Sequence, residues 1–206
     1  MEHYILMADV KLPGNGETTT LHQNVKNVIG VINKLHKKNF ITPLDIVIPG
    51  EFQGITNTLQ GSLEMMFDIE ECIIENNLDF KLKYVLYQDT IATVKSRQDA
   101  YERLGFGLIE ARDRLSAIKK TDSRFLINLN DDKLGLLLNN LFMIYEDYVD
   151  SWKVSEFDFV KAFLNNMTYK EVAAMFKINI SSGWRRERNL KMKQYYTIKE
   201  VILSSI

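Results

Sequence analysis

The sequence contains one cysteine among its 206 residues, Cys72, and only three histidines. A single cysteine can form neither an internal disulfide nor a cysteine-based zinc site, and the apolar neighbours of Cys72 indicate a small core residue. The histidines lack the spacing of metal ligands, so we interpret all three as surface residues: His3, His22 and His36. We therefore predict no cofactor and no metal site, apart from one candidate metal ligand, Asp9, which is discussed below.

Long apolar segments are also lacking. None approaches the roughly 20 consecutive apolar residues that span a bilayer. The first residues do not combine a basic segment, an apolar run and a cleavage site, so no signal peptide is visible. We expect a cytoplasmic protein without a membrane partner.

A strong net charge is the third missing feature. The formal net charge of -1 argues against a protein that coats nucleic acid without sequence preference. The average conceals an asymmetry, however. Residues 177–199 carry seven basic residues and one acidic residue, whereas residues 131–176 carry four basic and eight acidic ones. A local basic segment on a nearly neutral chain indicates a dedicated contact surface.

Apolar periodicity predicts an α+β fold. Strands are expected at 4–10, 44–48, 52–55, 80–87 and 124–129, and helices at 20–38, 57–76 and 99–120. The strand at 80–87 alternates apolar and polar residues, which is typical of a half-exposed strand. The first six elements have the order of the split unit of ferredoxin-like folds. We therefore predict an antiparallel sheet with helices on one face and the first strand at its centre.

From Asp131 onward the sequence predicts helices only, and the polar cluster Asn130-Asp131-Asp132 marks a domain boundary. Residues 1–130 would form the ferredoxin-like domain and fold alone, while residues 131–206 would form an all-α domain. A long apolar helix at 134–149 either belongs to the core of the chain or links domains or subunits. A homodimer is a candidate assembly, because one DNA-binding module buries little surface.

A helix-turn-helix is predicted at about 155–192. Thr168 and Glu171 have the spacing of a capping box at a helix start, and a second, basic helix follows the break at 177–179. Lys177 occupies the place of the usual turn glycine, and Gly183 that of a usual apolar residue, a contact that Trp184 would supply if the helix started one residue later. The candidate DNA-contacting residues are Asn179, Ser181, Ser182, Arg185, Arg186, Arg188, Lys191 and Lys193. Alternatively, this tail packs against a protein and uses Trp184 as an anchor.

Several short motifs are distributed along nearly the whole chain. One is Pro49-Gly-Glu-Phe-Gln-Gly54, in the expected hairpin, and the others are Ala8-Asp9, Gly105-Phe-Gly107, Ala111-Arg112, Leu115, Lys119 and Trp152. In their residues and order these motifs resemble the SatD family, whose signature Gly-Asp-Glu-Phe-Gln-Gly is similar to residues 49–54. The resemblance implies a nucleotide-cyclase-like domain of ferredoxin type, joined to a DNA-binding tail.

The resemblance also implies a site at the sheet. In cyclase-like proteins, carboxylates at the end of the first strand and at the hairpin tip bind divalent metals. Asp9 keeps the first position, but Gly50 replaces the second, and strand alternation would turn Glu51 to the opposite face. We therefore expect a catalytically degenerate domain that senses a nucleotide or another small ligand. Its candidate ligand-binding residues are Asp9, Glu51, Gln53, Gln88, Asp89 and Arg112.

Three functions remain open from the sequence. The leading hypothesis is a transcriptional regulator that binds double-stranded DNA. The second is a structural or protein-interaction module that has lost DNA binding. The third is a metal-dependent nucleotide-processing enzyme that uses Asp9.

Overall fold

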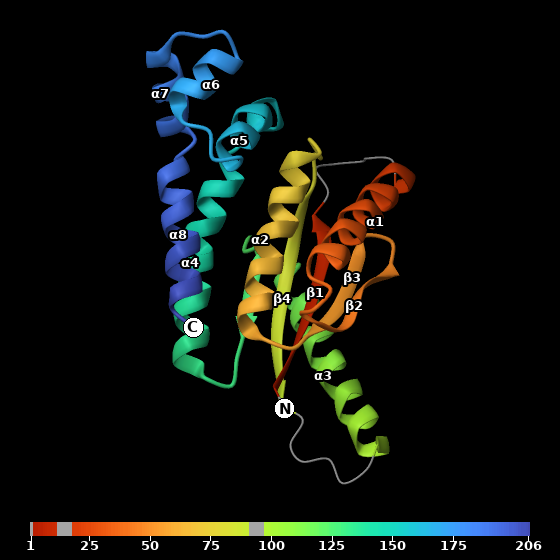
Figure 1. Cartoon of the computed structure of the whole chain (residues 1–206). Coiled ribbons are helices and arrows are strands. Elements are labelled where there is room, and N and C mark those ends of the chain that lie inside the picture. Colours follow the sequence, from red (N-terminus) through yellow and green to blue (C-terminus); the bar gives the residue numbers. More distant parts are fainter. Residues whose placement is uncertain (1, 12–17, 91–96) are drawn as a thin grey trace.

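The computed structural model of the chain describes residues 2–11, 18–90 and 97–206. These residues form an α+β structure with one five-stranded mixed sheet and eight α-helices (Figure 1). The elements, in chain order, are β1 (Glu2–Lys11), α1 (Thr18–Leu35), β2 (Phe40–Ile48), β3 (Glu51–Thr56), α2 (Leu59–Glu75), β4 (Lys81–Thr90), α3 (Arg97–Ile118), β5 (Phe125–Asn128), α4 (Asp132–Asp150), the 3-10 turn η1 (Val154–Glu156), α5 (Phe157–Leu164), α6 (Tyr169–Met175), α7 (Ile180–Asn189) and α8 (Met192–Ser204). Among the described helices, none is both long and apolar enough to cross a membrane.

The strand order in the sheet is β2-β3-β1-β4-β5. Strand β1 lies at the centre, as predicted, and pairs antiparallel with β3 and β4. Strand β5 pairs with β4 in parallel, so the expectation of a purely antiparallel sheet is wrong. The reason is the connection: α3 carries the chain back along the sheet, which brings the next strand in with the same direction.

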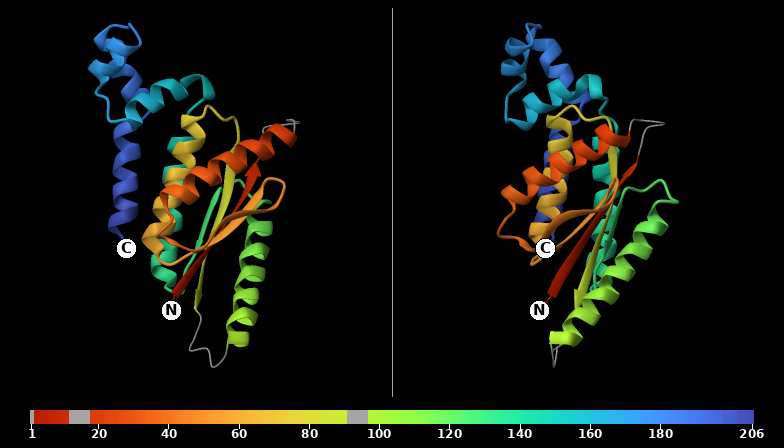
Figure 2. Two further views of the ribbon diagram at one scale, coloured as in Figure 1. Left: turned by 45° about the vertical axis from the view of Figure 1, so that its right-hand side comes forward. Right: turned by 90° about the vertical axis from the view of Figure 1, so that its right-hand side faces the viewer.

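Helices cover both faces of the sheet, and the expectation of one covered face is also wrong (Figure 2). Helix α3 packs on one face, where Ala111 and Leu115 share a core with Ile5 and Met7 of β1. Helices α1, α2 and α4 cover the other face. Strand β4 needs a helix on each face, because its residues Leu82 to Leu86 are all buried. The prediction of a half-exposed strand is therefore wrong.

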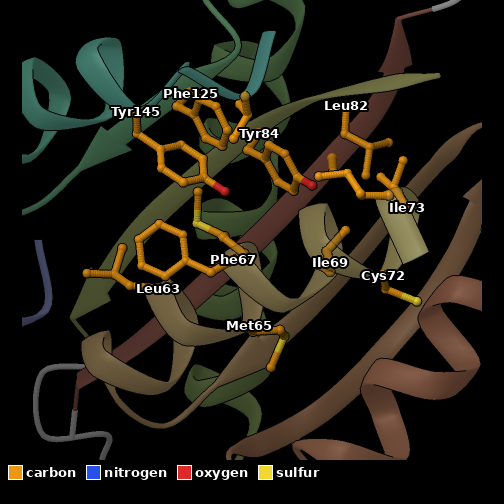
Figure 3. Packing of buried hydrophobic residues seen from close by; sticks show 14 of the residues in the cluster. Leu63, Met65, Phe67, Ile69, Cys72, Ile73, Leu82, Tyr84, Phe125 and Tyr145 are labelled. Carbon is orange, nitrogen blue, oxygen red and sulfur yellow. The ribbon is translucent and has the colours of Figure 1, made fainter. Parts of the chain in front are cut away.

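The larger core is continuous from the sheet into the C-terminal helices. Around Phe67 of α2, the rings of Tyr84, Phe125 and Tyr145 gather from β4, β5 and α4 (Figure 3). The ring centroids of Phe67 and Tyr145 are 5.0 Å apart. Apolar contacts thus cross the expected boundary at residue 130, and independent folding of residues 1–130 stays a prediction. The same core contains Cys72, which is buried as predicted.

Two buried polar groups stabilise this arrangement. Arg124 is 1% exposed, and its guanidinium donates to Glu70 of α2 at 2.5 Å and to Asp150 of α4 at 2.6 Å. It therefore joins both helices to the sheet. His36 is 8% exposed, and its Nε2 lies 2.7 Å from a carboxylate oxygen of Asp68. The interpretation of His36 as a surface histidine is wrong, because the turn after α1 brings its ring against α2.

Candidate functional site

Asp9 and Glu51 lie directly opposite each other in the pairing of β1 with β3. Residues opposite each other across two strands project to the same face of a sheet. The expectation that Glu51 points away from Asp9 is therefore wrong. The prediction assumed that Gly50 and Glu51 are successive strand residues, which would point to opposite faces. Gly50 instead belongs to the turn, with φ 86°, and the alternation of faces begins at Glu51, the first residue of β3.

Two cations neutralise this carboxylate pair: Arg112 of α3, and Lys119, the first residue after α3. Arg112 donates to Glu51 Oε1 at 2.7 Å, while Lys119 Nζ lies 3.3 Å from Glu51 Oε2 and 3.2 Å from Asp9 Oδ1. The side chain of Glu51 is only 5% exposed. Burial raises the pKa of Asp9, and the ammonium of Lys119 opposes that rise. The two carboxylates and two cations balance in charge, so a divalent metal would compete with Lys119 for the same oxygens.

Lys83 of β4 holds the end of α3 in this position. It lies opposite Asp9 in the pairing of β1 with β4, and its ammonium donates to the backbone carbonyls of Ile118 and Thr121. Cations stabilise a helix C-terminus because the last carbonyls lack partners within the helix. Burial lowers the pKa of Lys83. Lys83 was not among the site residues predicted from the sequence, although a lysine between apolar residues of a strand is a recognisable signal.

The remaining ligand-binding candidates do not join this pair. Gln53 shares the face of Glu51, two positions along β3. Asp89 pairs with His3 at the other end of β1, where its carboxylate packs against Gly107 of α3. Gln88 points to the opposite face and accepts a hydrogen bond from the backbone of Asn130 at 2.9 Å. The structure therefore groups Asp9, Glu51 and Arg112, adds Lys119, and separates Gln88 and Asp89 from them. Among the described residues, no group of three or more acidic, histidine or cysteine side chains has metal-binding geometry.

The second candidate site lies on α6 and α7, which project beyond the ends of α4 and α8, away from the sheet (Figure 1). The predicted capping box is present: Thr168 Oγ1 accepts from the backbone N–H of Glu171, and Glu171 accepts from the N–H of Thr168 at 2.7 Å. Lys177 has φ 53°, the left-handed conformation expected where glycine is usual in the turn. Asn179 caps α7 by accepting from the N–H of Ser182 at 2.8 Å. Capping side chains that are close in sequence thus define where α6 and α7 begin.

Gly183 permits the closest approach between α6 and α7. A Cβ atom at this position would overlap the backbone carbonyl oxygen of Tyr169 and lie 3.0 Å from Cβ of Ala173. No gap is left for another side chain to fill, and Trp184 is 43% exposed. The expectation that Trp184 supplies a missing core contact is therefore wrong. The small residues at 173 and 183 supply the packing instead.

The candidate DNA-contacting residues that belong to α7 lie on two sides of this helix. An outward stripe at spacings of three and four residues consists of Ser181, Trp184, Arg185 and Arg188. In this stripe, the Arg188 guanidinium lies over the Trp184 ring, 4.8 Å from its centroid. Arg185 is exposed, and its guanidinium donates hydrogen bonds to Ser181 and Ser182 of its own helix.

Two other cations of this segment contact neighbouring elements. Arg186 lies 3.4 Å from a carboxylate oxygen of Glu156 in η1, and its guanidinium lies 4.6 Å from the ring centroid of Phe159 in α5. Lys191 is 3.2 Å from Asp147 of α4. Lys193 is exposed at the rim of a hollow of about 420 Å³ that Trp184 and Arg188 also line. The outward stripe and Lys193 are therefore the part of the predicted set that presents charge to a partner.

Compared with known proteins, the chain matches no protein-family model and no curated protein. The resemblance to the SatD family accordingly stays a prediction that depends on the quoted motifs. Function has to be argued from the two sites themselves.

Proposed function

We propose that this protein is a DNA-binding regulator whose α6 and α7 act as a helix-turn-helix. The observation that carries the proposal is the outward stripe of α7, where Arg185 and Arg188 face solvent on the side away from α6. A second helix that is packed on its partner by a glycine, and cationic on its outer face, suits insertion into the major groove.

The geometry supports distinct roles along α7. Arg185 and Arg188 are spaced to reach phosphates or guanine edges, which arginine contacts with two parallel hydrogen bonds. Ser181 lies near the helix N-terminus, where unpaired backbone N–H groups favour an anion such as phosphate. Asn179 is engaged in capping, so we assign it a positioning role rather than a base contact.

We further propose that the sheet domain is a catalytically degenerate relative of cyclase-like ferredoxin folds. Its strand order β2-β3-β1-β4, with α1 and α2 as crossovers, supports the ferredoxin-like assignment. The intrachain cations on Asp9 and Glu51 argue against metal-dependent catalysis at this pair. A ligand-sensing role for the domain remains a hypothesis from the sequence.

A fluorescence-anisotropy titration with a short labelled DNA duplex tests the main proposal. We expect binding at about 50 mM salt, with an affinity that falls steeply as salt rises, because displaced counterions dominate such contacts. Replacing Arg185 and Arg188 together with Ala should make the log-log salt slope shallower by up to about 2. The matched control replaces Lys37 and Lys38, two exposed cations of the turn between α1 and β2, and should leave the slope unchanged.

The exposed Trp184 favours one competing function, a protein-interaction module. Large aromatic residues anchor many protein interfaces, and Trp184 lies beside a hollow that another side chain could enter. If the intact protein shows no salt-sensitive binding to duplex DNA at about 50 mM salt, the DNA proposal is wrong and this alternative replaces it.

A further inference from the structure

We infer that α4 forms a symmetric homodimer by packing antiparallel against α4 of a second copy. One face of α4 belongs to the core, with Leu138, Phe142 and Tyr145 fully buried. The opposite face is exposed although much of it is apolar. Between residues 133 and 147, the exposed positions of α4 are Lys133, Leu136, Leu137, Asn140, Met143, Ile144 and Asp147. We call this set the α4 stripe.

The α4 stripe is symmetric about Asn140. Leu137 and Met143 lie three positions on either side of it, and Leu136 and Ile144 lie four positions away. Lys133 and Asp147 lie seven positions away and carry opposite charges. In an antiparallel pair centred on Asn140, each apolar residue therefore faces an apolar residue of the second copy.

Charge complementarity selects a second copy of this chain as the occupant. With Asn140 on the twofold axis, Lys133 of each copy faces Asp147 of the other, so both ends of the contact join opposite charges. Asp147 also lies 3.2 Å from Lys191 of its own chain, but its side chain is 73% exposed and leaves room for a second cation. Within one chain the two residues are about 21 Å apart along the helix, too far to pair. An isologous contact requires such a self-complementary surface. Asn140 also suits the axis, because its amide both donates and accepts and can bond to its own copy.

The apolar residues of the stripe are unusually exposed for their size. Leu136 is 65% exposed, Met143 is 64% exposed, and Leu137 and Ile144 are 44% and 41% exposed. Beside Asn140 and Met143, a hollow of about 410 Å³ extends toward β5 and the end of α3, where Ile118 and Leu126 line it. Leu137 of the second copy would face Met143 next to this hollow. The contact thus extends beyond the single helix, as a specific interface requires.

This pairing has a consequence for the α7 surface. Helix α7 lies beyond the C-terminal end of α4 (Figure 1). An antiparallel α4 pair would therefore place the two α7 helices at opposite ends of the dimer. Such a dimer would contact two separated DNA segments instead of two neighbouring half-sites. The dimer itself does not depend on DNA binding, so it can be tested without DNA.

Sedimentation velocity of the full chain over a range of concentrations is the first test. We expect a monomer–dimer equilibrium with a dissociation constant on the order of micromolar, the range of small interfaces. Leu136→Glu should weaken the dimer by at least tenfold, because each interface would bury two uncompensated carboxylates. The matched control is Leu35→Glu on α1, since Leu35 is also 65% exposed but lies outside the stripe. A wild-type chain that stays monomeric at about 100 μM, or equal effects of the two variants, would overturn the inference.

A charge exchange tests the antiparallel register. Lys133→Glu and Asp147→Lys should each weaken the homodimer several-fold, because each places like charges together at both ends. A mixture of these two single variants should form a heterodimer, since every end then joins opposite charges again. Loss of folding cannot produce such recovery on mixing. If the mixture associates no better than either variant alone, the antiparallel register centred on Asn140 is wrong.

Discussion

The two charged regions of this protein differ in where their counter-charges lie. At the end of the sheet, Asp9 and Glu51 receive Arg112 and Lys119 from the same chain. On α7, the outward arginines form no ion pair with an acidic group in the part of the chain that the structure describes. Arg185 bonds within its own helix, and Arg188 lies over Trp184. The first region is internally compensated, whereas the second presents its charge to solvent.

The residue type of a charged side chain therefore does not indicate whether it stabilises the fold or is available to bind a partner. A buried ion pair is strongly coupled to stability, because removal of one partner leaves an uncompensated charge in the interior. An exposed cation contributes little to stability and stays available to a partner. The compensated region is thus expected to respond to mutation through folding, and the α7 surface through binding.

The largest expected effect is at Arg124, the most buried cation of the described chain. Arg124→Met should lower the free energy of unfolding by about 3–5 kcal/mol, because Glu70 would remain buried without its cation. Urea denaturation followed by circular dichroism measures the change. Arg185→Met is the control at an exposed arginine and should change stability by less than about 0.5 kcal/mol. Equal losses at both sites would remove the distinction between the two regions.

The second largest loss of stability is expected where α6 packs on α7. Gly183→Ala should cost about 1–3 kcal/mol, since the added Cβ overlaps the carbonyl oxygen of Tyr169 and must push the helices apart. Gly30→Ala in α1 is the control, because no heavy atom lies within 4 Å of its added Cβ. That control should be neutral or more stable by up to about 1 kcal/mol. A stabilised Gly183→Ala protein would show that the two helices pack differently.

Removal of Lys119 from the compensated region should change the protein's stability in a way that depends on pH. We expect Lys119→Ala to cost about 1 kcal/mol at pH 7, because Lys119 is partly exposed and solvent screens its two ion pairs. Without this cation, burial would raise the folded-state pKa of Asp9 further above its unfolded value. The folded protein would then bind a proton at Asp9 more tightly than the unfolded chain does. The loss in free energy of unfolding, relative to the wild type, should therefore become smaller as the pH falls through that pKa. Thermal melts of both proteins between pH 7 and pH 4 measure this trend, and a deficit that grows toward acid would contradict it.

The smallest stability effect is expected at Trp184. Trp184→Ala should change the free energy of unfolding by less than about 0.5 kcal/mol, because the side chain is 43% exposed and lies outside the core. Acrylamide quenching supplies an independent readout. Trp152 is 4% exposed, and its indole donates to the Leu190 carbonyl at 2.8 Å, so the variant should retain only poorly quenched fluorescence. Strong quenching in the variant would show that Trp152 is accessible.

Much of the local structure could be predicted from sequence. The centre strand, the order of elements and the capping box at Thr168 follow from apolar spacing and from side chains that bond to nearby backbone groups. The burial of His36 could not be predicted in the same way, nor could the packing of α3 on the second face of the sheet. They depend on contacts between elements distant in sequence, such as that of His36 with Asp68.

The starts of α6 and α7, the place of Lys177 in the turn and the basic character of the segment after it follow from the amino-acid sequence. These features depend on hydrogen bonds and conformational preferences within a few residues. The partner of each charged side chain, in contrast, depends on the packing of elements that are distant in the chain. Strand register placed Glu51 beside Asp9, and the packing of α3 brought Lys119 to both. The physical reason is that ion pairing acts over a few ångströms in space, and distance along the chain does not fix distance in the fold.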